Sequence, residues 1–123
     1  MAGTVGPYSP VVRAGQWLIC SGQLGIVDGS LVEGGLAAQV TQAIKNAAAL
    51  LESQGSGLDD VVKTTVFLTD MADFAAMNDA YVAAFGDNRP ARSAFAVAGL
   101  PLGARVEIEA WAYVSRSPAS SAN

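Results

Sequence analysis

The chain has 123 residues, the length of one ordinary domain that can bury a core of its own. Hydrophobic residues make up 51% of the chain and charged residues 15%, which excludes a disordered chain and leaves apolar surface that a subunit interface would cover. The net charge of −4 argues against a nucleic-acid binder that relies on a basic face.

Two strands and a turn are predicted first. Residues 10–14 (PVVRA) and 16–22 (QWLICSG) are rich in β-branched and apolar side chains on either side of Ala14-Gly15, a pattern typical of a hairpin. Asp28-Gly29 marks a turn within residues 27–31, and we expect a short third strand or an extended arm after it.

Two helices are predicted farther along the chain. Residues 36–54 carry apolar side chains at helical spacing, and Gly55 lies where a C-terminal cap belongs. In residues 73–85, Asp73 suits an N-cap and Gly86 ends the segment. The apolar stripe of this second helix is formed by Phe74, Met77, Tyr81 and Phe85.

Three further strands complete the pattern. Residues 61–69 (VVKTTVFLT) are rich in β-branched side chains, which favours a central strand. Residues 92–97 and 105–115 are expected to be two strands joined by a Gly/Pro turn. In the second of these, Glu107 and Glu109 alternate with apolar residues and therefore share one face of the strand.

The order β-β-β-α-β-α-β-β predicts a single α+β domain over residues 1–115, with two helices packed on one face of a mixed sheet. Residues 116–123 are of low complexity, and we expect them to form a disordered tail.

Several kinds of chemistry are excluded by residue counts. Cys20 is the only cysteine and histidine is absent, which excludes an internal disulfide, a Cys/His zinc site and a Ser-His-Asp triad. Cys20 itself lies beside an apolar run and is expected to be a buried core thiol. We therefore expect no metal. The chain also lacks an apolar run of about 20 residues and a secretory leader, so we expect a cytoplasmic protein without a membrane partner.

Several motifs carry a family resemblance. In chain order they are GPYSP (6–10), ICSGQ (19–23), LVEGG (31–35), the segment 60–81, PARSA (90–94), LP (100–101) and VEIEAWA (106–112). This ordered set resembles the YjgF/RidA family, the reactive-intermediate (enamine/imine) deaminases, over roughly residues 6–115. The resemblance implies a chorismate-mutase-like fold and a homotrimer with active sites in the clefts between subunits.

Arg92 and Glu107 are the leading candidates for chemistry. From the residues alone, Arg92 is either a solvated strand-end arginine or a bidentate clamp for a substrate carboxylate. Glu107 is either an exposed strand residue or a base for water. A guanidinium and a carboxylate brought together in a concave place would suit a small acid substrate. The resemblance implies the functional role for both: Arg92 binds the substrate carboxylate, and Glu107 contacts the substrate nitrogen and a water.

The resemblance also implies a set of lining residues. Each has an ordinary structural reading as well: Tyr8 as a turn aromatic, for example, or Asn78 as a helix-surface amide. The implied substrate-binding residues are Tyr8, Ser21, Gly22, Gln23, Asn78 and Ala94. Leu24-Gly25 replaces a proline common in the family, and we expect this change to affect substrate choice more than reaction type. Ala94 stands where the family often has cysteine, at a position that contributes mainly backbone.

The function implied is hydrolytic deamination of enamines and imines, such as 2-aminoacrylate and 2-imino acids, to 2-oxo acids and ammonia. No cofactor is expected, because a protonated imine is already an electrophile. One alternative is a non-catalytic module that binds small carboxylates in the same cleft. Others are a deaminase of a dedicated catabolic enamine and, against the acidic charge and the missing histidine, an RNA-cleaving protein.

Overall fold

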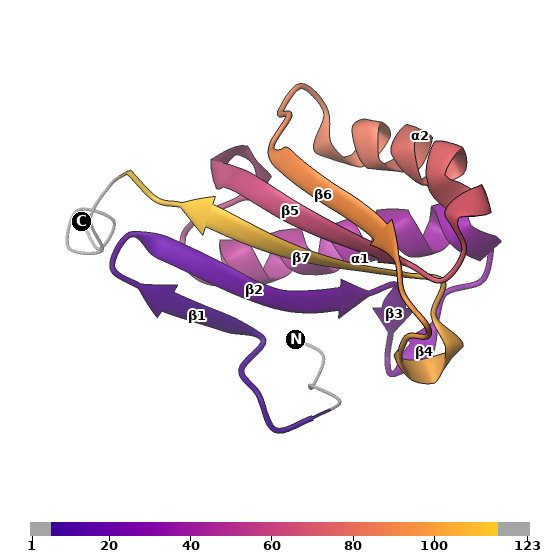
Figure 1. Cartoon of the computed structure of the whole chain (residues 1–123). Helices are drawn as coiled ribbons and strands as arrows, with labels where there is room; N and C mark the ends of the chain where they lie inside the picture. The colour runs from indigo at the N-terminus through magenta and orange to yellow at the C-terminus, as the bar shows by residue number, and fades with distance from the viewer. Residues whose placement is uncertain (1–5, 116–123) are drawn as a thin grey trace.

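The computed structural model describes residues 6–115, and the tail expected from residue 116 onward lies outside these residues. Its main feature is a five-stranded sheet in the order β1-β2-β7-β5-β6 (Figure 1). The strands are β1 (Val11–Ala14), β2 (Trp17–Leu24), β5 (Val61–Leu68), β6 (Ala91–Ala96) and β7 (Val106–Tyr113). β5 and β6 run parallel and the other neighbouring strands run antiparallel, so the sheet is mixed.

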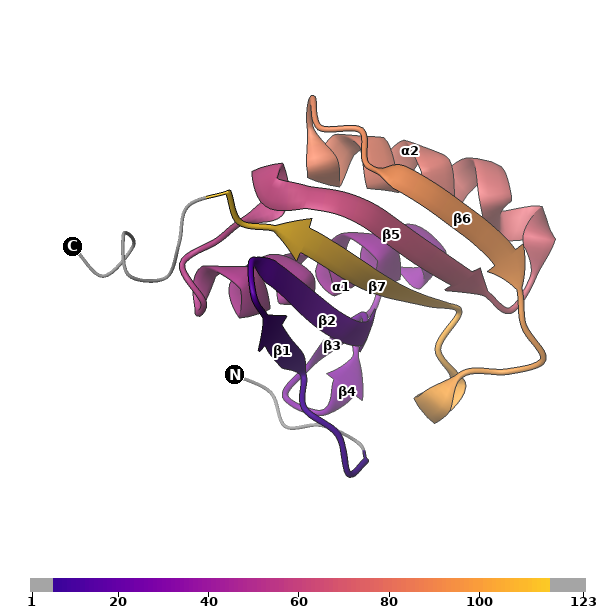
Figure 2. The same ribbon diagram turned by 60° about the vertical axis from the view of Figure 1, so that its left-hand side comes forward.

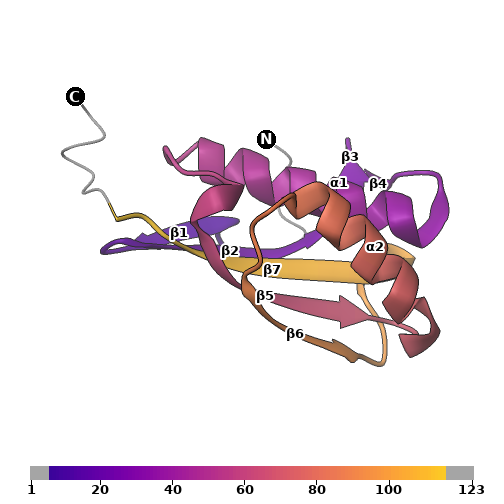
Figure 3. The same cartoon turned by 90° about the horizontal axis from the view of Figure 1, so that it is seen from above.

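Two helices cover one face of this sheet. They are α1 (Gly35–Glu52) and α2 (Phe74–Phe85). Figure 3 shows both helices on the same side, with the opposite face of the sheet uncovered, and Figure 2 shows the strands in front of them. The prediction of an α+β domain with two helices on one face of a mixed sheet is confirmed.

The two-residue period of β7 shows how the sequence assigns its two faces. Val106, Ile108 and Ala110 are each at most 1% exposed and belong to the core under the helices. Glu107 and Glu109 alternate with them and therefore point to the uncovered face. This orientation is the one that the sequence predicts.

The observed elements differ from the predicted ones at residues 27–31. Residues 27–31 do not add a strand to the main sheet, because β3 (Ile26–Val27) and β4 (Ser30–Leu31) pair only with each other. The prediction of a central strand in residues 61–69 is confirmed, because β5 has β7 on one side and β6 on the other.

The N-terminal end of α2 also differs in detail. Asp73 is the N-cap position, but its side chain makes no capping hydrogen bond. The side chain of Asp70 accepts a hydrogen bond from Ala72 N at 2.9 Å instead. Within residues 6–115, none of the helices is both long and apolar enough to cross a membrane.

Candidate active site

Arg92 lies on β6, the edge strand of the sheet, and faces the helix layer. Its register partner on β5 is the fully buried Thr64. The Arg92 guanidinium carbon lies 4.9 Å from the ring centroid of Tyr81 and 5.6 Å from that of Phe74, both on α2. Nη1 of Arg92 is 3.6 Å from the Met77 sulfur. Between residues 6 and 115, no carboxylate forms an ion pair with Arg92, so its charge is available to a ligand.

Two other predicted residues belong to the same region. Asn78 follows Met77 on α2, and its side-chain oxygen Oδ1 is buried without a hydrogen-bond partner. Ala94 is the next residue of β6 that faces the helices. Because β6 has a strand on one side only, half of its backbone groups are left unpaired by the described sheet.

Glu107 lies in a second region, on the uncovered face of β7. Its carboxylate rests against Gly22, where a Cβ atom would collide with Glu107 Oε2. Any other residue at this position would displace the carboxylate. Burial raises the pKa of Glu107, and the negative charge of Glu109 raises it further. The carboxylate is therefore a stronger base than an ordinary glutamate.

The segment before β1 is tied to this second region through Ser21. Ser21 Oγ donates a hydrogen bond to Ser9 O at 2.7 Å, and Ser21 N donates one to Pro10 O at 2.9 Å. These bonds hold the neighbouring Tyr8, which is 45% exposed, near the irregular part of β2. Gln23 Nε2 donates to Ser21 O at 3.0 Å. Ser21, Gly22, Gln23 and Glu107 thus form one group, and Tyr8 lies one residue before the Ser9 carbonyl that is bonded to it.

The two regions do not meet within one chain. β5 lies between the strands of Arg92 and Glu107, and the two side chains point to opposite faces of the sheet. Two strand spacings alone separate these strands by about 10 Å. The expectation that guanidinium and carboxylate come together in a concave place is therefore not met by a single subunit.

The sequence does not predict three features of the site. Phe74, Met77 and Tyr81 were predicted as core, and they also contact Arg92. Helical spacing alone identifies an inner stripe but does not say which strand residue it contacts.

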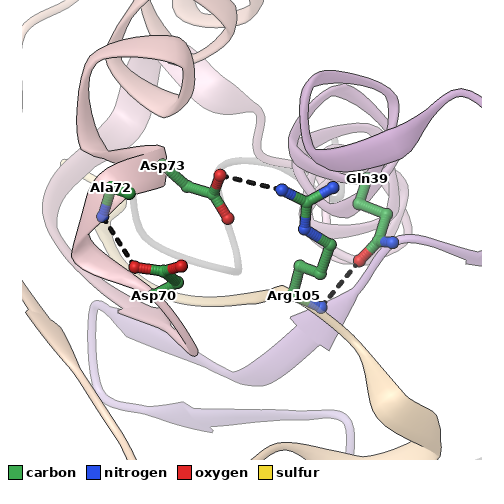
Figure 4. A network of polar contacts seen from close by, with 5 residues as sticks. All are labelled: Gln39, Asp70, Ala72, Asp73 and Arg105. Carbon is green, nitrogen blue, oxygen red and sulfur yellow. Dashed lines mark hydrogen bonds and ion pairs between the residues drawn. The ribbon is translucent and has the colours of Figure 1, made fainter.

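The second feature is the polar network before β7 (Figure 4). Arg105 Nη2 pairs with Asp73 Oδ1 at 2.8 Å, and Arg105 N donates to Gln39 Oε1 at 2.9 Å. These bonds link the start of β7 to the N-terminal parts of α1 and α2. The three residues are far apart in the sequence and share no motif.

The third feature is the packing of Gly25. A Cβ atom at this position would lie 2.5 Å from the Cα of Gln39 on α1. Gly25, which belongs to the Leu24-Gly25 pair that replaces the family's proline, therefore lets the end of β2 lie close to the α1 backbone. The structural effect seen here is on the packing of β2 against α1.

Residues 6–115 thus combine an α+β fold, an uncovered sheet face, an arginine without an ion pair and a glutamate with a raised pKa. The family model described as Endoribonuclease L-PSP matches residues 2–114. The chain belongs to this family, which is the YjgF/RidA family that its motifs resemble.

Several of the relatives carry a specific enzyme name. The human protein named 2-iminobutanoate/2-iminopropanoate deaminase is 46% identical over 110 residues, which cover 88% of this chain and 80% of the relative. A Schizosaccharomyces pombe relative, 42% identical over 107 residues covering 85% of each chain, is named as a mitochondrial protein.

Solved structures share the fold closely. RidA from an Antarctic Psychrobacter has a TM-score of 0.87 and 44% identity, with 91% of this chain and 92% of that chain covered. Escherichia coli TdcF with bound serine has a TM-score of 0.85 and 33% identity, with 92% of each chain covered.

Proposed function

We propose that the protein is a hydrolase that deaminates 2-imino acids, and the enamines that tautomerise to them, to 2-oxo acids and ammonia. The observation that carries the proposal is the guanidinium of Arg92, which lies against the rings of Tyr81 and Phe74 and forms no ion pair among residues 6–115. The enzyme name of the 46% identical human relative supports this reaction. The serine bound to TdcF, a small molecule with a carboxylate and a nitrogen on C2, is consistent with it.

In this proposal Arg92 binds the substrate carboxylate through two parallel N–H···O bonds and so fixes the orientation of the imine. Asn78 accepts a hydrogen bond through its buried Oδ1. Unpaired backbone groups of β6 near Ala94 line the same place. These groups bind and orient the substrate, and they perform no proton transfer.

Glu107 supplies the base. Its raised pKa favours acceptance of a proton from a water molecule, whose oxygen adds to C2 of the protonated imine. Glu107 then passes this proton to the nitrogen, the C–N bond breaks, and ammonia leaves as the C2 hydroxyl gives its own proton to Glu107 and becomes the carbonyl. Gly22 gives the carboxylate room, while Ser21, Gln23 and the ring of Tyr8 line the approach. Positioning and electrostatics carry the catalysis, and no cofactor is required.

A homotrimer would complete the site. The uncovered sheet face carries large exposed side chains, which a stable monomer rarely leaves in water. They are Trp17, Phe95, Trp111 and Tyr113, each between 37% and 46% exposed. Packing of this face against neighbouring copies would bring Glu107 of one subunit next to Arg92 of another. The split between the two regions supports this arrangement.

We also propose the cytoplasm as the place of action. Because one relative is mitochondrial by name, fractionation of the producing cells with an antibody against the chain is the measurement that decides it.

The reaction is tested by generating 2-aminoacrylate in situ with a serine dehydratase and trapping the surviving imine with semicarbazide. The protein is expected to suppress the trapped product and to increase the release of pyruvate and ammonia. If it binds 2-oxo acids in an Arg92-dependent way but leaves the trapped product unchanged, it is a binding module and the proposal is wrong.

A further inference from the structure

We propose that Thr64 and Tyr81 form a positioning pair that fixes the guanidinium of Arg92 for carboxylate binding and thereby sets the affinity for the acid substrate. The inference rests on the proposed function and extends it to two residues that do not touch the substrate. It starts from a closed set of contacts around Arg92. Thr64 is its neighbour across the β5–β6 ladder, and Tyr81 is the ring beneath its guanidinium.

Two contacts fix the position of the Tyr81 ring. Its hydroxyl lies 2.7 Å from Thr64 Oγ1, and the two side chains are 4% and 0% exposed. Phe85, one turn later on α2, packs against the ring with the centroids 4.7 Å apart. Burial raises the pKa of Tyr81, so the hydroxyl stays neutral and keeps its hydrogen bond at physiological pH. The ring is therefore a fixed platform.

This platform matters because of the geometry of a guanidinium. Its flat face stacks on an aromatic ring, while its N–H donors point outward in the plane of the group. The guanidinium carbon of Arg92 lies 4.9 Å from the ring centroid of Tyr81 and 5.6 Å from that of Phe74, so both rings contact the group. Its N–H donors form no ion pair among the described residues, and only Nη1 has a side-chain acceptor, the weakly accepting Met77 sulfur at 3.6 Å. A mobile ring would leave the long arginine side chain free to adopt other rotamers, and binding would then cost side-chain entropy.

The alternative is that the hydrogen bond only satisfies two buried hydroxyls. The two explanations differ in what they predict for ligand affinity. A structural pair affects the melting temperature alone, whereas a positioning pair affects binding of a carboxylate more than binding of an uncharged analogue. Thr64→Val and Tyr81→Phe remove one hydroxyl each and preserve shape, and Tyr81→Leu removes the platform itself. Thr69→Val, on an exposed residue just after β5, is the matched control.

The experiment measures calorimetric Kd for 2-oxobutanoate and for 2-oxobutanamide, together with KM, kcat and melting temperature, for the full chain. We expect Thr64→Val and Tyr81→Phe to weaken 2-oxobutanoate binding and raise KM by about fivefold, and Tyr81→Leu to do so by about tenfold or more. The Kd of the amide and kcat should change less than about twofold, and Thr69→Val should match the wild type. In an Arg92→Lys background, Tyr81→Phe should add little.

Unchanged Kd and KM in Thr64→Val and Tyr81→Phe, with a lower melting temperature, would overturn the positioning role and leave the proposed function intact. Equal losses of affinity for 2-oxobutanoate and for 2-oxobutanamide would also overturn it, because they would indicate general damage to the pocket. A wild-type protein that neither binds 2-oxobutanoate nor consumes the imine would overturn the proposed function and this inference together.

Discussion

Arg92 and Glu107 point to opposite faces of the same sheet, with strand β5 between the strands that carry them. Arg92 faces the helices and contacts the rings of Phe74 and Tyr81, whereas Glu107 rests on Gly22 at the uncovered face. A small acid bound to the guanidinium of one subunit is therefore out of reach of the carboxylate of that subunit. In the proposed homotrimer, a second copy of the chain would supply the missing group.

Replacement of Arg92 by alanine should lower kcat/KM by about 100-fold, because two charge-assisted hydrogen bonds to the substrate carboxylate are lost. Arg92→Lys should recover little of this loss, since an ammonium cannot form the paired geometry. Steady-state kinetics with dehydratase-generated imine measures both. The matched control is Arg89→Ala, because Arg89 is exposed and bonds to the carbonyls of Gly86 and Asn88. Near-normal kinetics in Arg92→Ala would refute the clamp.

Glu107→Gln should reduce kcat by about 100-fold or more while binding of 2-oxobutanoate stays within about threefold, because the amide keeps the shape but is not a base. Calorimetry and turnover, measured on the same preparation, separate the two effects. A variant that loses affinity and turnover in equal measure would show that Glu107 binds the substrate rather than activating water.

The pH dependence of turnover should reflect the environment of Glu107. Burial and the charge of Glu109 raise the pKa of Glu107 above its ordinary value of 4.5. As the pH is lowered, Glu107 should therefore be protonated, and activity lost, at a higher pH than with an ordinary glutamate as the base. Glu109→Gln removes the negative neighbour and lowers this pKa. The acid limb of kcat/KM should then move to lower pH. A limb that stays in place, or moves upward, would contradict the assignment of Glu107 as the base.

Gly25→Ala should destabilise the fold by about 1–3 kcal/mol, because the added Cβ would overlap the α1 backbone at Gln39. Gly57→Ala is the control: nothing lies within 4 Å of its Cβ position, and its φ of −174° is open to any residue. Urea unfolding followed by circular dichroism gives both free energies. Equal stability of the two variants would mean that the end of β2 adjusts without cost.

The sequence predicts well which face of a strand is buried, but it predicts poorly which strands pair with one another. Val106, Ile108 and Ala110 alternate with Glu107 and Glu109, and this period identifies the uncovered face of β7. Which strands pair depends on contacts far apart in the chain. The insertion of β5 between β6 and β7 therefore had no local signal, and neither did the resulting separation of Arg92 from Glu107.

The same limit applies to polar contacts. Asp73 has the sequence context of a helix cap, but Arg105 draws its side chain toward the start of β7, and Asp70 caps the turn instead. Tyr81 was predicted correctly as a core residue, yet its hydroxyl bonds to Thr64 and its ring carries Arg92. Such double roles follow from the packing of α2 on β5 and β6.

The most direct test of a site shared between subunits is complementation between two inactive variants. Arg92→Ala and Glu107→Ala are co-expressed with different tags, and assemblies that contain both chains are purified and assayed. A subunit with Glu107→Ala still supplies Arg92, and a subunit with Arg92→Ala still supplies Glu107. Their shared boundary therefore forms an intact site.

We expect each variant alone to be inactive and the purified mixed trimers to recover about a third of the wild-type rate, since one of the three boundaries in every mixed trimer joins an intact Arg92 to an intact Glu107. If the mixed assemblies are as inactive as assemblies of either variant alone, both residues act within the same subunit. This result would contradict a site shared between subunits.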